Sequence, residues 1–232
     1  MSSVSAPVIR AFDGCYETRR AAALSGVPLS TIYYWARTGV VAPSISQERP
    51  KLWSYADLMG LRIVYWLRHP KGAEGDRLPA SPMAEVRRAL QRVDAAGLEL
   101  WSPGPDVPGP SPLRVDRQGR IYVRGLDGVV DAEGQGVLDP DALDLLGVFA
   151  VDGCQGPDLR APRDRLRIVP GKVAGEPHVA GTRVTTPALA ALHTRGYPLE
   201  VIAELYPDLD REAIAEALDL EDELADSVAA AA

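Results

Sequence analysis

A proline-rich stretch near the middle of the chain places the tightest limit on how this sequence can fold. Five of the eleven residues in Ser102–Pro112 are proline and two are glycine. Proline fixes φ and lacks a backbone N–H, so this stretch cannot form a helix or a central strand. Pro70–Pro82 contains three more prolines and two glycines among polar residues. We interpret both stretches as linkers, and the 232 residues are then expected to form one to three domains.

The composition is that of a globular protein. Hydrophobic residues make up 46% and charged residues 25%, which argues against disorder over the full length and against a fibrous fold. The first ten residues contain no apolar segment of a signal peptide, and the longest apolar run, around Leu145–Val151, is too short to cross a bilayer. Cys15 and Cys154 lie too far apart in sequence for a Cys-x-x-Cys metal site and do not form a disulfide framework. We therefore expect a cytoplasmic protein.

The first segment, Tyr16–His69, has the pattern helix, tight turn, helix, loop, helix. Thr18 is a candidate N-cap of the first helix, and Ser25-Gly26 would end it. The second helix is expected from near Pro28 to Arg37, with Gly39 ending it. Two helices joined by so short a turn cross at a large angle, in helix-turn-helix geometry. The small core between them is expected to contain Ala23, Val27, Ile32 and Trp35.

A loop and a third helix complete this segment. Val40–Trp53 contains two prolines and basic residues, which favours an extended loop of the kind called a wing. The third helix is expected to begin at Ser54 or Tyr55. It carries apolar residues at helical spacing, among them Leu58, Leu61, Val64, Tyr65 and Leu67.

The next helix, Met83–Ala96, leaves two alternatives open. Its apolar residues follow the a and d positions of two heptads, which would form a dimerisation seam. Coiled coils normally need three or more heptads, so the helix could equally pack on its own domain. The seam residues are Met83, Val86, Leu90 and Val93.

Short strands are expected after the proline-rich stretch. Leu113–Val115 and Arg120–Val123 flank Gln118-Gly119, which predicts a β-hairpin. Further apolar runs would extend this sheet and lead into a short helix that starts at Asp139-Pro140: Val129–Val130, Val137–Leu138, and then Leu143, Leu145 and Leu146.

The last segment, Arg163–Leu224, predicts a short strand, a loop rich in glycine and proline, and three helices. The strand is Leu166–Val169 and the loop is Pro170–Arg183. The three helices would begin at Thr186-Pro187, at Pro198 and after Asp210, and the first would end at Gly196. The alanine-rich tail from Ser227 is expected to fray.

These patterns predict an α+β protein that is mainly helical. We expect a winged helix-turn-helix domain at residues 10–70. A dimerisation helix with a small β region would follow at 71–160, and a three-helix, helix-turn-helix-like domain at 161–226.

The net charge of −7 is unevenly distributed. Residues 10–70 contain eight basic and four acidic residues, a balance of +4, whereas 71–160 carry −5 and 161–232 carry −6. A basic head on an acidic body suggests partners of opposite charge, with chance clustering as the alternative. The acidic residues at 204–226 would lie on helical surfaces that face solvent or a partner.

No motif in the sequence points to an enzyme. There is no Gly-x-Gly-x-x-Gly after a strand and no phosphate-binding loop. His69, His178 and His193 have no partner at a metal-ligand spacing, and the serines and cysteines lack a nucleophile context. We therefore expect no catalytic residues, no metal and no cofactor.

The first segment resembles the DNA-binding head of MerR-type regulators. The resemblance is carried by Thr31–Trp35, Arg37–Pro43 and Lys51–Leu58. It implies that the second helix enters the major groove and that the wing contacts the flanking backbone, although Tyr33 stands where the family usually has arginine. Core packing is the alternative for the two tyrosines, and Trp35 is assigned to the core. The candidate DNA-binding residues, with Arg19 of the first helix included, are Arg19, Thr31, Tyr33, Tyr34, Arg37, Arg49 and Lys51.

The last segment resembles a small bacterial domain that occurs in VapB-like antitoxins. The matching residues are Arg167–Lys172, Gly175–Val179, Gly181–Val184, Gly196, Tyr206–Leu209, Ile214 and Ala217-Leu218. With the two resemblances in this order, the chain is similar to a long VapB-like antitoxin, whose toxin would be a PIN-like ribonuclease that holds its own metal. The candidate partner-binding residues are Gly181, Thr182, Arg183 and Tyr206. The alternative is that Gly181–Arg183 is only a turn and a cap before the next helix.

The sequence thus predicts an antitoxin of a type II toxin–antitoxin pair. It would bind operator DNA as an autorepressor and bind a PIN-like ribonuclease toxin, with no membrane partner. A homodimer through 83–96 would place two recognition helices about 34 Å apart on a near-palindromic site. One alternative is a stand-alone MerR-like regulator that senses a small ligand. A ribonuclease or other enzyme is the other, and the absence of clustered catalytic residues counts against it.

Overall fold

The computed structural model describes residues 13–70, 78–98, 113–115, 120–123 and 145–230. The protein is α+β and mainly helical, with small two-stranded antiparallel sheets, as the sequence predicts. Its described helices are α2 (Thr18–Ser25), α3 (Leu29–Thr38), α4 (Tyr55–Arg68), α5 (Met83–Ala95), α6 (Thr186–Thr194), α7 (Leu199–Leu205) and α8 (Arg211–Ala230). None of them is long and apolar enough to cross a membrane.

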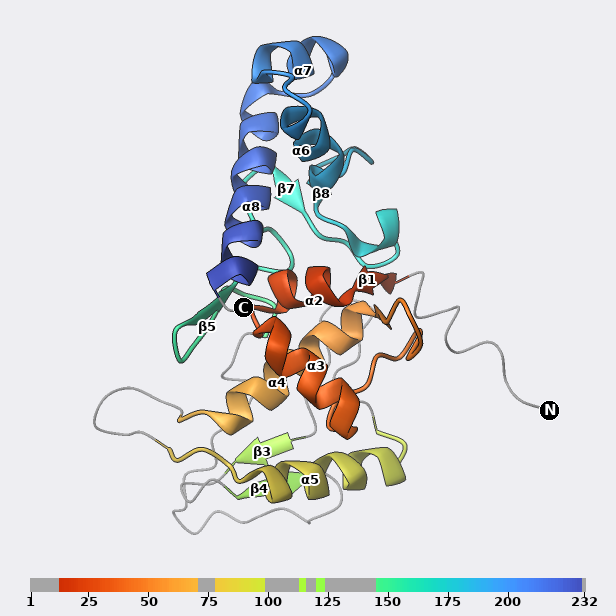
Figure 1. The fold of residues 1–232 in the computed structure, drawn as a ribbon, viewed down its shortest axis with the longest axis vertical. Helices are drawn as coiled ribbons and strands as arrows, with labels where there is room; N and C mark the ends of the chain where they lie inside the picture. The colour runs from red at the N-terminus through yellow and green to blue at the C-terminus, as the bar shows by residue number, and fades with distance from the viewer. Residues whose placement is uncertain (1–12, 71–77, 99–112, 116–119, 124–144, 231–232) are drawn as a thin grey trace, which may run out of the picture.

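Each strand pairs with the next strand along the chain, and the helix-turn-helix lies between the two strands of the first pair. The pairs are β1 (Tyr16–Glu17) with β2 (Leu52–Trp53), β3 (Leu113–Val115) with β4 (Ile121–Val123), β5 (Phe149–Val151) with β6 (Cys154–Gly156), and β7 (Leu166–Arg167) with β8 (His178–Val179). Figure 1 shows α6 and α7 at one end of the long axis, α2–α4 in the middle, and α5 with β3 and β4 at the other end.

Helices α2 and α3 form the expected helix-turn-helix. Gly26 and Gly39 take the left-handed conformation, with φ of 74° and 66°, and end the two helices. Ala23, Val27, Ile32 and Trp35 are all buried, as predicted. Two details are corrected: Pro28 is the N-cap rather than part of α3, and Thr18 is the first residue of α2 rather than its N-cap. The Thr18 hydroxyl instead accepts a hydrogen bond of 3.1 Å from Trp53 Nε1, because β1 pairs with β2.

The third helix begins where the sequence predicts, at a capping box. The Ser54 hydroxyl accepts from the Asp57 N–H at 3.2 Å, and the Asp57 carboxylate accepts from the Ser54 N–H at 2.8 Å. The same carboxylate accepts from both the N–H and the hydroxyl of Ser44, which anchors the loop between α3 and α4. Burial raises the pKa of Asp57 although these hydrogen bonds oppose the shift.

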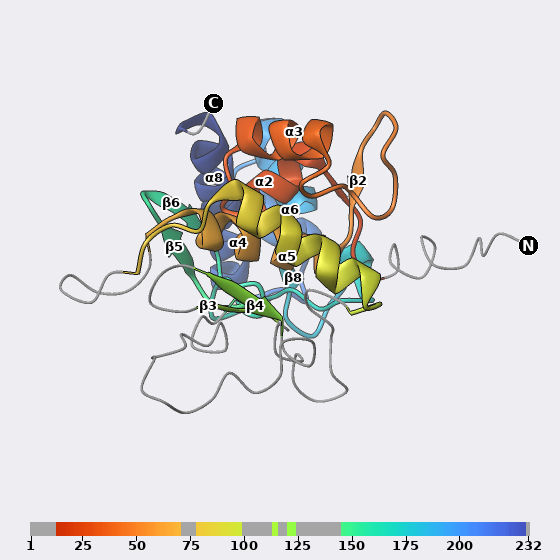
Figure 2. The same ribbon diagram turned by 90° about the horizontal axis from the view of Figure 1, so that it is seen from below.

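The apolar seam of α5 packs inside the chain, as the second alternative predicted. Val86 and Val93 are buried, and Met83 and Leu90 are half-buried against the same core. Helix α5 lies against β4 and α4, beside the β3–β4 hairpin (Figure 2). The prediction that these four residues form a dimer seam is therefore corrected, because β4 and α4 cover the apolar face that a second copy would need.

The hairpin β3–β4 is confirmed, but the expected helix at Leu145 and Leu146 is not. Both residues lie in a bend, because the Leu145 carbonyl accepts from Arg62 and the Leu146 carbonyl from the Leu159 N–H. The runs 129–130 and 137–144 lie outside the described residues. The hairpin β5–β6 was not predicted, although its Asp152-Gly153 turn, with φ of 49° and 78°, is a strong hairpin signal.

The C-terminal helices follow the predicted order, with one large correction. Thr185 rather than Thr186 is the N-cap of α6, and α7 is shorter than expected. Helix α8 continues to Ala230 instead of fraying from Ser227. Its last turns are held because Leu224 and Val228 are buried and α8 packs on α2.

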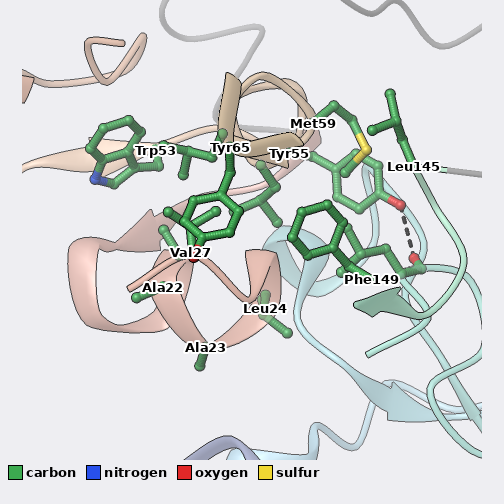
Figure 3. Packing of buried hydrophobic residues seen from close by; sticks show 14 of the residues in the cluster. Ala22, Ala23, Leu24, Val27, Trp53, Tyr55, Met59, Tyr65, Leu145 and Phe149 are labelled. Carbon is green, nitrogen blue, oxygen red and sulfur yellow. Dashed lines mark hydrogen bonds between the residues drawn. The ribbon is translucent and has the colours of Figure 1, made fainter. Parts of the chain in front are cut away.

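The three expected domain ranges share one hydrophobic core. In Figure 3 the rings of Tyr65 and Phe149 lie next to each other, with centroids 6.2 Å apart. The dashed line marks the Tyr55 hydroxyl, which donates to the Leu159 carbonyl at 2.8 Å. Helix α4 is therefore packed directly on the chain that leads into the C-terminal helices.

Alanine substitutions at two glycines test how closely α2 packs against β6. Replacing Gly26 by alanine would place a Cβ 2.6 Å from the Gly156 N, whereas Gly39 has nothing within 4 Å. Both substitutions carry the strain of a left-handed residue, about 1 kcal/mol. Gly26→Ala adds an overpacking cost of about 1–3 kcal/mol, so urea denaturation should show the larger loss for Gly26→Ala. Equal losses would mean that β6 moves away from α2 at little cost.

Candidate nucleic-acid interface

The exposed face of α3 carries four polar side chains at the spacing i, i+3, i+4 and i+7. They are Ser30, Tyr33, Tyr34 and Arg37. Tyr33 is 52% and Tyr34 46% exposed, so core packing does not explain either tyrosine. Trp35, by contrast, is buried as predicted. Sequence reasoning missed Ser30, although the helical spacing of these residues would have found it.

Lys51 of the loop joins this face. A shallow depression is lined by Ser30, Tyr33, Tyr34, Arg37 and Lys51. The Lys51 ammonium donates to the Gln47 carbonyl at 2.6 Å, which holds its side chain across the exposed loop. The Arg37 guanidinium lies 6.0 Å from the centre of the Tyr34 ring, within the range of a cation–π contact. Two positive charges and two phenol hydroxyls thus meet on one surface.

The other predicted DNA-binding residues lie elsewhere or at its margin. Thr31 is half-buried on α3, and Arg49 is exposed on the loop two residues before Lys51. Arg19 does not belong to this surface. It lies on α2 and lines a different depression, shared with Glu176 and Glu221, between α2 and α8. Figure 1 shows α2 between α3 and the C-terminal helices.

Some of the basic side chains in residues 10–70 bind groups within the protein and do not add positive charge to the surface around α3. Arg20 binds Glu176 and Glu221, Arg62 is buried among backbone carbonyls, and Arg68 donates to the Ser81 carbonyl. The positive charge displayed around α3 therefore comes from Arg37, Arg49 and Lys51. Such cations neutralise phosphates, and hydroxyls donate to phosphate oxygens, so this surface suits a nucleic-acid backbone.

Two of the candidate partner-binding residues, Gly181 and Thr182, lie in a turn before α6. Gly181 has a φ of 77°. The Thr182 hydroxyl donates to the Val179 carbonyl at 3.0 Å and accepts from the Val184 N–H at 3.1 Å. The alternative of a turn before α6 therefore accounts for both residues. Arg183 is exposed, and Tyr206 is half-buried against the core.

Many acidic side chains of α8 are paired within the chain. Arg163 binds Asp219 and Glu223, and Arg165 binds Glu212 and Glu216. These pairs explain why the acidic excess of the sequence is larger than the free negative charge of the surface. In the described part of the chain, no group of three or more His, Cys, Asp or Glu side chains is placed to hold a metal ion.

Residues 167–220 match a family model described as "Protein of unknown function (DUF433)". The match begins in β7 and ends inside α8. The last ten residues of α8, which include Glu221, Leu224 and Val228 at the contact with α2, therefore lie beyond it. No curated protein and no solved structure matches the chain.

Proposed function

We propose that this protein is an antitoxin of a type II toxin–antitoxin pair that also binds its operator DNA. The α2–α3 unit, with its wing, would bind DNA as MerR-type heads do. The C-terminal helices would bind and silence a PIN-like ribonuclease. The main support for DNA binding is that four side chains lie on one exposed surface: Tyr33, Tyr34, Arg37 and Lys51.

On DNA, α3 would lie in the major groove with Tyr33 and Tyr34 near its centre. The Arg37 and Lys51 side chains would neutralise phosphates on the groove edges, and the phenol hydroxyls would donate to phosphate oxygens. These contacts fix the position of the protein on DNA but carry no sequence information by themselves.

The partner-binding part is supported by the family match at 167–220 and by the resemblance of the two segments, in this order, to a long VapB-like antitoxin. Acidic side chains that are not paired within the described chain would favour a basic protein partner and speed its association. A homodimer is part of the proposal, with its interface outside the α5 seam, which packs on β4 and α4 within the chain.

The DNA-binding proposal predicts a specific loss for Arg37→Ala/Lys51→Ala. We expect the affinity of this double variant for a labelled DNA fragment from upstream of the gene to fall by about 10- to 100-fold. Its affinity for an unrelated fragment should fall by a similar factor. The slope of log K against log salt should become shallower by about 2, because two phosphate contacts are lost. Fluorescence anisotropy at several salt concentrations measures both.

Arg183→Ala/Arg195→Ala is the matched control, since it removes two exposed arginines from the C-terminal segment. Its DNA affinity should stay close to that of the unaltered protein. If the α3 double variant keeps full affinity, the DNA-binding face is elsewhere. If the control loses as much, binding is spread over the whole molecule.

Partner binding is tested with the tagged full-length chain in its native host, by mass spectrometry of proteins that co-purify in stoichiometric amount. Deletion of 163–232 is unsuitable, because α8 packs on α2 and its removal would expose the shared core. A PIN-like nuclease would support the antitoxin proposal. Operator DNA without a protein partner would favour the ligand-sensing regulator.

A further inference from the structure

A groove lies where the α2–α3 turn, the β5–β6 hairpin and α8 meet. Its volume is about 760 Å³. Its lining is largely apolar. Pro28, Leu29 and Cys154 are the half-buried apolar residues there, whereas Ala22, Val27, Leu224 and Val228 are buried. This groove does not include the candidate partner-binding residues Gly181–Arg183 and Tyr206.

The rim of this groove is acidic. Its carboxylates are Asp152, Asp219, Asp222, Glu223 and Asp226, and none of the described side chains that line it is a lysine, arginine or histidine. Arg163 pairs with Asp219 and Glu223, and His69 lies 3.4 Å from Asp152. Within the described chain, Asp222 and Asp226 have no cationic partner and are exposed.

The position of these two aspartates on α8 is unfavourable in the free protein. They are four residues apart, so their like charges face each other on one side of the helix. A positively charged group seated at the rim would relieve this repulsion, so the groove favours a cationic occupant.

We propose that this groove binds a segment of a partner protein that carries lysine or arginine on one side and apolar residues on the other. The apolar side would cover Pro28, Leu29 and Cys154, and the basic side would lie against Asp222 and Asp226. Nucleic acid is disfavoured here, since its phosphates would meet the carboxylates. This proposal rests on the proposed function, because it takes the partner to be the toxin. It adds the surface that the toxin would occupy.

The first probe is a fluorescein-labelled amphipathic peptide of leucine and lysine, with the leucines on one helical face. It is titrated into the full chain. Asp222→Lys/Asp226→Lys should weaken binding at least about 10-fold, because two attractive contacts become repulsive. Glu204→Lys/Asp208→Lys makes the same charge change at exposed positions outside the groove and should leave the dissociation constant within about twofold. Asp222→Asn/Asp226→Asn should weaken peptide binding to an intermediate extent. It replaces the lysine double variant in this test if that variant fails to fold.

Three results with the peptide would overturn the proposal. Equal weakening by both lysine pairs would mean that only the overall charge is sensed. Unchanged binding of a peptide in which glutamine replaces leucine would mean that the apolar walls are not used. No binding of the leucine–lysine peptide would also count against the groove.

The second probe is the co-purified PIN-like protein, which separates this proposal from the proposed function. If it binds Asp222→Lys/Asp226→Lys as tightly as the unaltered chain, the groove is not its site although the antitoxin function stands. If no such protein exists but the leucine–lysine peptide binds with the predicted variant pattern, the groove stands and the antitoxin function fails. Loss of the protein with this variant alone would support both.

Discussion

Replacement of Arg62 by methionine is expected to lower the free energy of unfolding by about 4 kcal/mol. Arg62 is fully buried, and its guanidinium lies 5.2 Å from the centre of the Phe149 ring. Its N–H groups donate to five backbone carbonyls at 2.6–3.1 Å, those of Leu24, Ser25, Leu145, Gly147 and Pro157.

The size of this effect follows from what the five carbonyls lose. Two of them belong to the last turn of α2, where helix carbonyls have no partner within the helix. A buried acceptor left without a donor costs about 1–3 kcal/mol, and several such losses are not additive. Methionine keeps much of the aliphatic volume, so the loss reports mainly on the hydrogen bonds rather than on a cavity.

Urea denaturation followed by tryptophan fluorescence measures this effect. Arg62→Lys restores the charge but offers fewer donors in a different geometry, so it should also be destabilised. Arg88→Met, with a side chain that is 71% exposed on α5, is the matched control and should be unchanged within error. A loss below about 1 kcal/mol for Arg62→Met would show that water or rearranged backbone replaces the guanidinium.

Replacement of Arg20 by methionine should cost about 3 kcal/mol, because it leaves two largely buried carboxylates without their cation. Arg20 lies on α2 and donates to both oxygens of Glu221 on α8 at 2.8 Å and to Glu176 at 2.9 Å. Arg19→Met provides a control at the adjacent, exposed position. It should leave stability unchanged, since no charged partner of Arg19 lies within the described chain.

The Arg20 effect should also depend on pH. Burial raises the pKa of Glu176 even though Arg20 lowers it, so loss of Arg20 should raise this pKa further. A carboxyl group with a raised pKa in the folded state destabilises the protein above that pKa, and protonation relieves the cost. The stability difference between Arg20→Met and the unaltered protein should therefore shrink as pH falls from 7 towards 5.

A double-mutant cycle isolates this interaction. Glu221→Gln added to Arg20→Met should recover part of the lost stability, because it removes one of the unpaired charges. Strictly additive losses would mean that Arg20 and Glu221 do not interact in solution. A loss that is the same at pH 5 and pH 7 would argue that the effect of Arg20 comes from packing of its aliphatic stem.

The features predicted correctly are those that depend on a few neighbouring residues. Gly26 and Gly39 end helices because glycine tolerates a positive φ, and Ser54 starts a helix because its hydroxyl accepts an N–H of the first turn. The polar face of α3 follows from helical periodicity alone. Much of the candidate DNA interface could therefore be predicted from the sequence, namely Tyr33, Tyr34, Arg37 and Lys51.

The errors concern what covers each element. Periodicity showed that α5 has an apolar stripe, but β4 and α4 rather than a second copy cover it. It could not separate Arg19 from Arg20, since their roles depend on α8, whose Glu221 lies 201 residues from Arg20. The length of α8 was missed for the same reason, because its alanine-rich end is held by contact with α2.

The sequence alone thus set where most helices and turns form and which of their faces are apolar, because these depend on local backbone preference and side-chain spacing. The burial of Arg62, the pairing of Arg20 across the molecule and the acidic groove beside α8 arise only in the folded chain. Each of them joins groups that lie far apart in sequence, and no local pattern specifies which distant segment will supply the partner.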